Sequence, residues 1–215
     1  MTSRDEGLLV VVSGPAGSGK STLVDRVIRC NPDWVRRAVT ATTRKPRPGE
    51  VNEKDYYFLE RGEFEQLIAD GEFLEHTQFN GNYYGTPRHS LEKELSKGGI
   101  VTLVIEVEGA SAVREYFQDA LFVFIIPPAP HILRKRLEAR GTESAQEIEN
   151  RLDIATREMQ YIEEYDFLIV NGDLDTATRD LVAVIRSVDR SLIVGGELDR
   201  WQQGMYVDWH TRPMI

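Results

Sequence analysis

The sequence predicts an α/β fold in which a parallel sheet carries helices on both of its faces. Four short apolar runs, typical of strands buried on both sides, recur at Leu8–Val12, Ile100–Val107, Leu121–Ile126 and Phe167–Val170. Segments with apolar residues at helical spacing separate these runs, and this alternation is the one that builds parallel sheets. A length of 215 residues suits one such domain with insertions.

A glycine-rich turn follows the first predicted strand. Residues 14–21 (GPAGSGKS) match the phosphate-binding pattern G-x-x-x-x-G-K-S. The glycines let consecutive backbone N–H groups converge on an anion, and a helix predicted over Ser21–Arg29 starts directly behind the turn. In such a loop Lys20 reaches the β- and γ-phosphates, and the Ser21 hydroxyl holds Mg²⁺. The sequence therefore predicts a nucleotide-binding loop in a fold of the P-loop NTPase type.

Residues 38–95 break the alternation and predict an inserted subdomain of mixed α+β structure. Its expected strands and helices lie at Asp55–Leu59, Glu63–Asp70, Phe73–Phe79, Tyr83–Tyr84 and from Pro87 to Gly98. Near its start, prolines 46 and 48 forbid regular structure and display Arg44 and Arg47 on a loop. Tyr83 is interpreted as an ordinary strand aromatic that packs a small core.

The remaining elements are helices that connect and close the predicted sheet. They are expected over Ala110–Phe117, Pro130–Arg140, Ser144–Glu163 and Leu174–Leu192. The core is accordingly assigned to residues 7–37, 96–129 and 165–194 of a domain over 1–195. The tail, 196–215, holds Trp201, Tyr206 and Trp209 without a clear period, so packing on the core, homo-oligomer formation and disorder all stay open for it.

Charge and composition narrow the classes of partner. The formal net charge of -9 argues against a general nucleic-acid binder, because such proteins neutralise phosphates. Cys30 is the only cysteine, which excludes an intrachain disulfide. No apolar run approaches the roughly 20 residues that span a bilayer, and no signal peptide is evident. We therefore expect a cytoplasmic protein with no membrane partner.

Beyond the phosphate loop, the chain resembles guanylate kinases from Leu8 to about Leu192. The matching stretches are GPAGSGKSTL at 14–23, TTRKPRPGEVNEKDYYF at 42–58, EFLEHTQFNGNYYGT at 72–86, IEVEGA at 105–110, RLEARGTES at 136–144 and IVNGDLD at 169–175. The resemblance implies a nucleoside monophosphate kinase that transfers the γ-phosphoryl group of ATP to GMP or dGMP with Mg²⁺, in purine nucleotide metabolism. It also implies that 38–95 binds GMP and that 130–164 forms a mobile lid.

For the acceptor nucleotide, the resemblance implies that Arg44 and Arg47 hold the GMP phosphate with the hydroxyls of Tyr56 and Tyr84. A guanidinium fork suits a phosphate because it bonds two oxygens at once. Guanine presents two adjacent donors, N1–H and the 2-amino group, which one carboxylate can accept together. The residues implied at the base are Glu75, with Thr40 and Thr86 at the O6 and N7 edge, and Glu106. Taken alone, Glu75 reads equally well as a solvated edge residue.

For the donor nucleotide and the chemistry, the resemblance implies ATP in the loop formed by Gly14, Pro15, Ala16, Gly17, Ser18, Gly19, Lys20, Ser21 and Thr22. Asn171 matches a position near the adenine. The catalytic residues implied are the cations Lys20, Arg44, Arg136, Arg140 and Arg151. Because the acceptor phosphate is already ionised near neutral pH, alignment and charge neutralisation are expected to suffice without a strong base.

Three positions depart from the family pattern, and two other functions stay open. Thr40 replaces a more usual serine, Val104 stands where an acid is typical, and Glu108 replaces a usual glutamine. The alternatives are a non-catalytic guanylate-kinase-like module that binds protein partners, and a kinase of the same fold with another phosphorylated acceptor. The intact pattern at 14–21 favours catalysis over the binding module.

Overall fold

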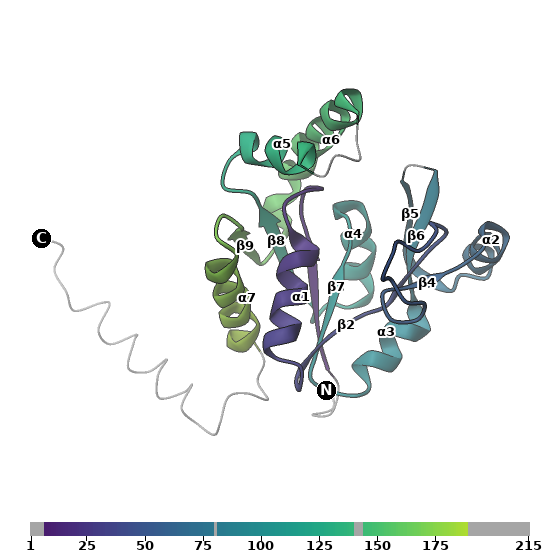
Figure 1. Cartoon of the computed structure of the whole chain (residues 1–215). Helices are drawn as coiled ribbons and strands as arrows, with labels where there is room; N and C mark the ends of the chain where they lie inside the picture. Colours follow the sequence, from purple (N-terminus) through teal and green to yellow (C-terminus); the bar gives the residue numbers. More distant parts are fainter. Residues whose placement is uncertain (1–6, 80, 140–143, 189–215) are drawn as a thin grey trace, which may run out of the picture.

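The computed structural model describes residues 7–79, 81–139 and 144–188. Its core is a five-stranded parallel sheet in the order β2-β7-β1-β8-β9 (Figure 1). The strands are β1 (Leu8–Ser13), β2 (Val35–Arg37), β7 (Ile100–Val104), β8 (Leu121–Ile126) and β9 (Phe167–Val170). This architecture confirms the predicted fold class.

Helices cover both faces of this sheet, which explains why its strands are apolar throughout. On one face, Val10 and Val12 pack with α1 (Lys20–Cys30) and α7 (Leu174–Val188). On the other face, Leu9 and Val11 pack with α3 (Arg88–Leu95) and α4 (Val107–Tyr116). Successive residues of β1 thus belong to opposite core clusters, as the period of a strand requires.

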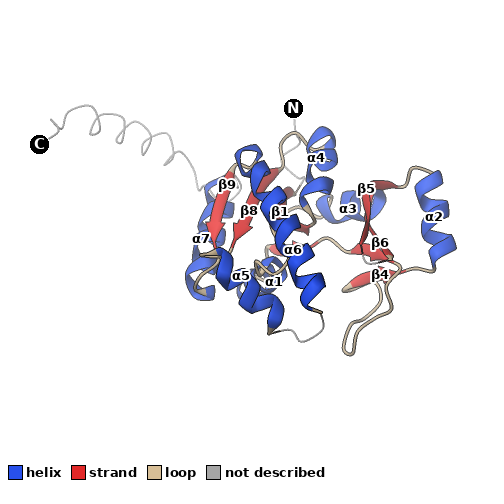
Figure 2. Ribbon diagram, turned by 90° about the horizontal axis from the view of Figure 1, so that it is seen from above, coloured by secondary structure: helices blue, strands red, loops and turns tan. Residues whose placement is uncertain are grey.

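A second sheet lies beside the core and is built from the segment predicted as an insertion (Figure 2). Its order is β4-β3-β6-β5, with β3 (Thr40–Thr42), β4 (Tyr56–Phe58), β5 (Phe73–Phe79) and β6 (Asn82–Pro87). Helix α2 (Arg61–Ala69) covers it through Phe64, whose ring stacks 4.3 Å from Phe73 and 5.3 Å from Tyr83. The packing role predicted for Tyr83 is confirmed.

The two sheets share apolar contacts through α3. Leu91 and Leu95 of this helix, although within residues 38–95, belong to the core cluster that also holds Leu74 of β5. The insertion is therefore anchored on the core at its C-terminal end. Its boundaries, like those of the lid and the tail, stay a prediction.

Above the carboxyl ends of the core strands stand α5 (Pro130–Glu138) and α6 (Ala145–Glu158) (Figure 1). A small cluster that includes Leu133, Leu137 and Ile148 holds them together. Ser144 and Glu147 cap α6 reciprocally, which fixes where the helix begins. Arg140 and residues 141–143 of the predicted lid lie outside the described residues, as does the predicted tail 196–215.

Several predicted elements have other bounds in the structure, and two short strands were not predicted. The strand predicted over 100–107 ends at Val104, because Glu106 is the N-cap residue of α4 and the buried Ile105 and Val107 belong to the turn and the helix. The helix predicted over 144–163 is α-helical only to Glu158 and continues as a 3₁₀ helix, η1 (Met159–Glu164). The short strands β2 and β3 were not predicted as separate elements. Within the described residues, no helix is both long and apolar enough to cross a bilayer.

Candidate active site

The phosphate loop connects β1 to α1 at the carboxyl edge of the core sheet. Gly14, Gly17 and Gly19 all have positive φ, of 135°, 91° and 92°, a region that side chains disfavour. A Cβ atom on Gly14 would lie 2.1 Å from the backbone oxygen of Ile125. The loop conformation therefore requires glycine both for its φ angles and for its close approach to β8.

Two side chains far away in the sequence support this loop from outside. The carbonyl oxygen of Ser18 accepts from Asn171 Nδ2 at 2.8 Å and from Arg136 Nη1 at 3.1 Å. Arg136 also donates to the Asn171 carbonyl oxygen at 2.7 Å. In the structure both residues hold the loop backbone, so α5 and the segment after β9 fix the loop. Their contacts with a nucleotide stay a prediction.

Lys20, the first residue of α1, places a buried cation at the loop. Its Nζ donates to the carbonyl oxygens of Gly14 and, at 3.4 Å, of Pro15. It also lies 3.5 Å from Oε2 of Glu106, whose side chain is half exposed. Ser21 and Thr22 follow in the first turn of α1 with exposed side chains, where the free N–H groups of a helix favour an anion.

The second sheet brings together three of the four residues predicted to hold the acceptor phosphate. Arg44 lies with its Cζ 5.4 Å from the ring centre of Tyr56, and the rings of Tyr56 and Tyr84 meet edge to face at 6.5 Å. Arg47, the fourth, has an exposed side chain on the neighbouring loop. Burial raises the pKa of Tyr56, which keeps its hydroxyl protonated as a donor.

Glu50 is a residue of this site that the sequence analysis missed. Its two carboxylate oxygens accept from Nη1 and Nη2 of Arg44 at 2.9 and 3.0 Å. Oε2 also accepts from the backbone N–H of Arg47 at 2.7 Å. This paired contact orients the Arg44 guanidinium and raises its pKa. The sequence did contain a signal for Glu50, because it is an acidic residue three positions after Arg47 in a basic segment.

Glu75 of β5 is the buried carboxyl group of the site. Thr86, directly opposite on β6, donates its hydroxyl to Glu75 Oε1 at 2.5 Å. On the other side, a Cβ atom on Gly109 of α4 would lie 2.6 Å from Glu75 Oε2. Burial, with the nearby charge of Glu106, raises the pKa of Glu75 to about 7. Its buried position contradicts the reading of Glu75 as a solvated edge residue.

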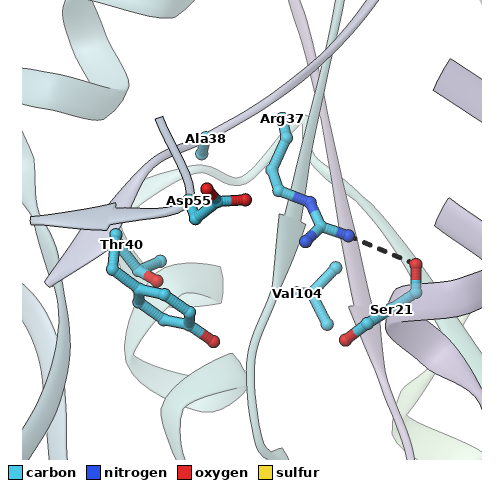
Figure 3. A pocket seen from close by; sticks show the side chains of 7 residues that line it. Ser21, Arg37, Ala38, Thr40, Asp55 and Val104 are labelled. Carbon is cyan, nitrogen blue, oxygen red and sulfur yellow. Dashed lines mark hydrogen bonds between the residues drawn. The ribbon is translucent and has the colours of Figure 1, made fainter. Parts of the chain in front are cut away.

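A small pocket of about 30 Å³ joins the phosphate loop to the second sheet (Figure 3). Its lining residues are Ser21, Arg37, Ala38, Thr40, Asp55, Tyr56 and Val104. Ser21 comes from the loop side, whereas Thr40 and Tyr56 come from the side predicted to bind the acceptor. The two predicted halves of the site therefore meet here.

The region predicted as a lid reaches this site through α5 and α6. Arg136 contacts the loop as described above, and Arg134 instead pairs with Glu149 of α6 at 2.6 Å, which supports a structural role for Arg134. Arg151 is half-buried on α6. At the end of α6, burial and the neighbouring Glu106 raise the pKa of Glu158, while Lys20 opposes this rise. Helix α6 thus brings a further acid to the Lys20–Glu106 pair.

Magnesium needs few protein ligands when phosphates supply the rest. Among the described residues, no group of three or more His, Cys, Asp or Glu side chains is placed to hold a metal ion. The Ser21 hydroxyl, beside the pocket and at the start of α1, is an oxygen ligand of the kind that Mg²⁺ accepts together with phosphate oxygens and water. The donor set therefore fits a magnesium ion that arrives with a nucleotide.

Comparisons with known proteins agree with this geometry. A family model described as guanylate kinase matches residues 6–188. The chain is 42% identical over 182 residues to a guanylate kinase of Desulfitobacterium hafniense, covering 85% of this chain and 90% of the relative. It is 47% identical over 171 residues to a guanylate kinase of Trichormus variabilis, covering 80% and 85%. A crystal structure of guanylate kinase from Anaplasma phagocytophilum has a TM-score of 0.69 at 32% identity, with coverage of 87% and 88%.

A parallel sheet with a glycine-rich loop between its central strand and a helix defines a nucleotide-binding protein of the P-loop class. Beside this core, the protein has a second sheet that carries the buried carboxyl group of Glu75, and a phosphate loop by itself requires neither feature. With the comparisons, this is sufficient to place the protein: the chain belongs to the guanylate kinase family.

Proposed function

We propose that this protein transfers the γ-phosphoryl group of ATP to GMP or dGMP and releases ADP and GDP or dGDP. An oxygen of the acceptor phosphate bonds to the γ-phosphorus of ATP, and the bond to the β–γ bridging oxygen breaks. The observation that carries the proposal is the buried Glu75–Thr86 pair on the second sheet, since Thr40 and Tyr56 of the same sheet share a pocket with Ser21 of an intact phosphate loop. The setting we propose is purine nucleotide metabolism in the cytoplasm.

Glu75 supplies the specificity for guanine. Its ionised carboxylate accepts from N1–H and the 2-amino group of the base, while the hydroxyls of Thr86 and Thr40 approach the O6 and N7 edge. Glu106, beside Glu75, adds a second acceptor. Adenine lacks the N1–H and the 2-amino group, so it would leave a buried carboxylate unsatisfied, which costs on the order of several kcal/mol.

Arg44 and Arg47 bind the acceptor phosphate with the hydroxyls of Tyr56 and Tyr84. The bidentate contact between Arg44 and Glu50 supports this role, because a carboxylate presents two oxygens to the guanidinium in the way a phosphate does. On the donor side, Lys20 and the loop N–H groups bind the ATP phosphates. Asn171, which holds the Ser18 carbonyl, positions the loop near the adenine.

Catalysis in this account comes from alignment and charge neutralisation. The acceptor phosphate has a second pKa of about 6 and is ionised at neutral pH, so no strong base is needed. The Ser21 hydroxyl would hold Mg²⁺ together with the donor nucleotide, and the ion would supply positive charge that offsets the charge of the phosphates. Arg136, Arg140 and Arg151 supply cations from the lid, which excludes water when it closes.

An acceptor panel tests the proposal. ADP release is measured with GMP, dGMP, AMP, CMP and UMP at equal concentrations. Turnover confined to GMP and dGMP is expected. Equal rates with AMP and GMP would contradict the specificity for guanine. No turnover with any acceptor would favour the non-catalytic binding module.

A further inference from the structure

Arg37, to which the proposed function assigns no role, lines the pocket between the two predicted halves of the site. Arg37 is the last residue of β2 and pairs in register with Thr102 of β7, so its side chain starts at the carboxyl edge of the core sheet. Ligands of open α/β sheets bind at this edge. Figure 3 shows the guanidinium reaching in beside Ser21 and Val104.

The contacts of this guanidinium use one of its nitrogens. Nη2 lies 3.0 Å from Oδ1 of Asp25 and 3.4 Å from the carbonyl oxygen of Ser21. Nε is buried and donates to no acceptor among the residues that the structure describes. Because a guanidinium carries five N–H donors in one plane, most of its hydrogen-bonding capacity is left for a ligand. An oxyanion in the pocket would satisfy it.

The surroundings favour an anion rather than a further protein contact. Val104 of β7 gives the pocket an apolar wall beside the guanidinium, where an acid would have formed an ion pair. Asp55 is the acid of the pocket, and its Oδ2 accepts from the backbone N–H of Val51 at 2.7 Å. The side chain of Asp25 is 54% exposed, so solvent weakens its pairing with Arg37.

Arg37 also acts on the residues proposed to bind the acceptor phosphate. Its positive charge opposes the rise in the pKa of Tyr56 that burial causes. Thr40 and Tyr56 line the pocket from one side and Ser21 from the other. A phosphate that reaches the Tyr56 hydroxyl from the loop side would therefore meet the Arg37 guanidinium.

We infer that Arg37 is a third arginine for the acceptor phosphate, which it contacts on the side facing the phosphate loop. This inference rests on the proposed function. It assigns to Arg37 a share of the charge neutralisation at the point where donor and acceptor phosphates meet. Its contact is with the phosphate and not with the guanine base.

Binding of GMP and of guanosine separates this role from a structural one. Dissociation constants for GMP, guanosine and ATP are measured by calorimetry on the wild type, Arg37→Gln and Arg37→Lys. Loss of a charge-assisted contact is expected to weaken GMP about tenfold or more in Arg37→Gln, with guanosine and ATP changed less than about twofold. Arg37→Lys should fall between, because it keeps the charge without the planar fork.

Asp25→Asn serves as the matched control, since it removes the ion-pair partner but keeps the guanidinium. Near-wild-type GMP binding is expected for it. Three results for Arg37→Gln would overturn the inference. They are an equal weakening of GMP and guanosine binding, a loss of ATP binding instead of GMP binding, and a GMP affinity unchanged from the wild type. Should Arg37→Gln not fold, Arg37→Lys carries the same comparison. If the wild-type protein does not bind GMP, the proposed function itself is wrong. The wild-type titration gives this result before any variant is compared.

Discussion

The hydroxyl of Thr86 donates to Oε1 of Glu75 across the β5–β6 pair, and a backbone hydrogen bond from Thr86 also reaches this buried carboxyl group. These hydrogen bonds from one residue do not replace the water that a carboxylate loses on burial. The pKa of Glu75 is therefore raised to about 7. A guanine base would supply the missing donors. The Glu75 carboxylate is therefore an acceptor whose hydrogen bonds are completed only when the ligand binds.

The first prediction concerns stability without nucleotide. Between pH 4.5 and 7 the folded protein holds a proton on Glu75 that the unfolded chain has released, so the free energy of unfolding falls as pH rises through this window. In Glu75→Gln this loss is absent. Relative to the variant, the wild type should lose roughly 2 to 3 kcal/mol between pH 4.5 and 8.

Urea unfolding of both proteins across this pH range measures the difference. The raised pKa of Glu158 acts in both proteins and cancels. Parallel stability curves for the two proteins would show that the Glu75 carboxyl is not perturbed as described.

The second prediction concerns Gly109, which α4 places against the Glu75 carboxyl group. The Cβ atom of Gly109→Ala would lie 2.6 Å from Glu75 Oε2, and the carboxylate would have to move. We expect KM for GMP to rise at least about tenfold and KM for ATP to stay within about twofold, because a displacement of about 1 Å at a reacting site is costly. Steady-state kinetics with each substrate varied in turn measures both.

Gly62 is the matched control for this helix glycine. A Cβ atom on Gly62 of α2 meets no atom within 4 Å, so Gly62→Ala should leave both KM values unchanged and stabilise the protein by about 0.5 to 1 kcal/mol. Equal kinetics for Gly109→Ala and Gly62→Ala would contradict the close contact at Glu75.

The third prediction concerns the support of the phosphate loop. Asn171→Ala removes one of the two side-chain donors to the Ser18 carbonyl oxygen. The loop N–H groups then lose part of their fixed geometry, and ATP should bind about tenfold more weakly while GMP binding is retained. Calorimetric titration with each nucleotide checks this, with Asn150→Ala on the exposed side of α6 as control. A weakening of GMP alone would contradict the assignment of this side to the donor.

The fourth prediction concerns Lys20. Its ammonium group is buried against the loop carbonyls and Glu106, which places it to neutralise charge on the transferred group. Lys20→Met should lower kcat at least about 10²-fold, with GMP affinity within about threefold of the wild type. Rapid-quench measurement of a single turnover separates this effect from product release. A change in KM alone would limit Lys20 to substrate binding.

Much of the core could be predicted because continuous apolar runs identify buried strands. Leu121–Ile126 and Phe167–Val170 form strands with the predicted bounds. The edge strand β2 was missed, because three residues with two arginines carry no apolar run and pair only through the tertiary position of β7. The end of β7 was placed too late for a related reason, since a buried turn and a helix start are also apolar.

For the site, residue types inside a motif were easier to predict than pairings between segments. The glycines of the loop follow from backbone conformation alone. The hydrogen bonds from Arg136 and Asn171 to the Ser18 carbonyl oxygen could not be predicted in this way, because they join three segments that lie more than thirty residues apart in the sequence. Arg37 was missed for the same reason, because its place in the pocket depends on how β2 pairs with β7.

The central claim is that Glu75 makes this protein a kinase of guanine nucleotides. The most direct test is the ratio of kcat/KM for GMP to that for AMP, measured for the wild type and for Glu75→Gln. The account predicts a wild-type preference of about 10⁴-fold or more and a fall of at least about 100-fold in the variant, because both donors of guanine lose an ionised acceptor. A ratio near one for the wild type, or the same ratio in both proteins, would contradict it.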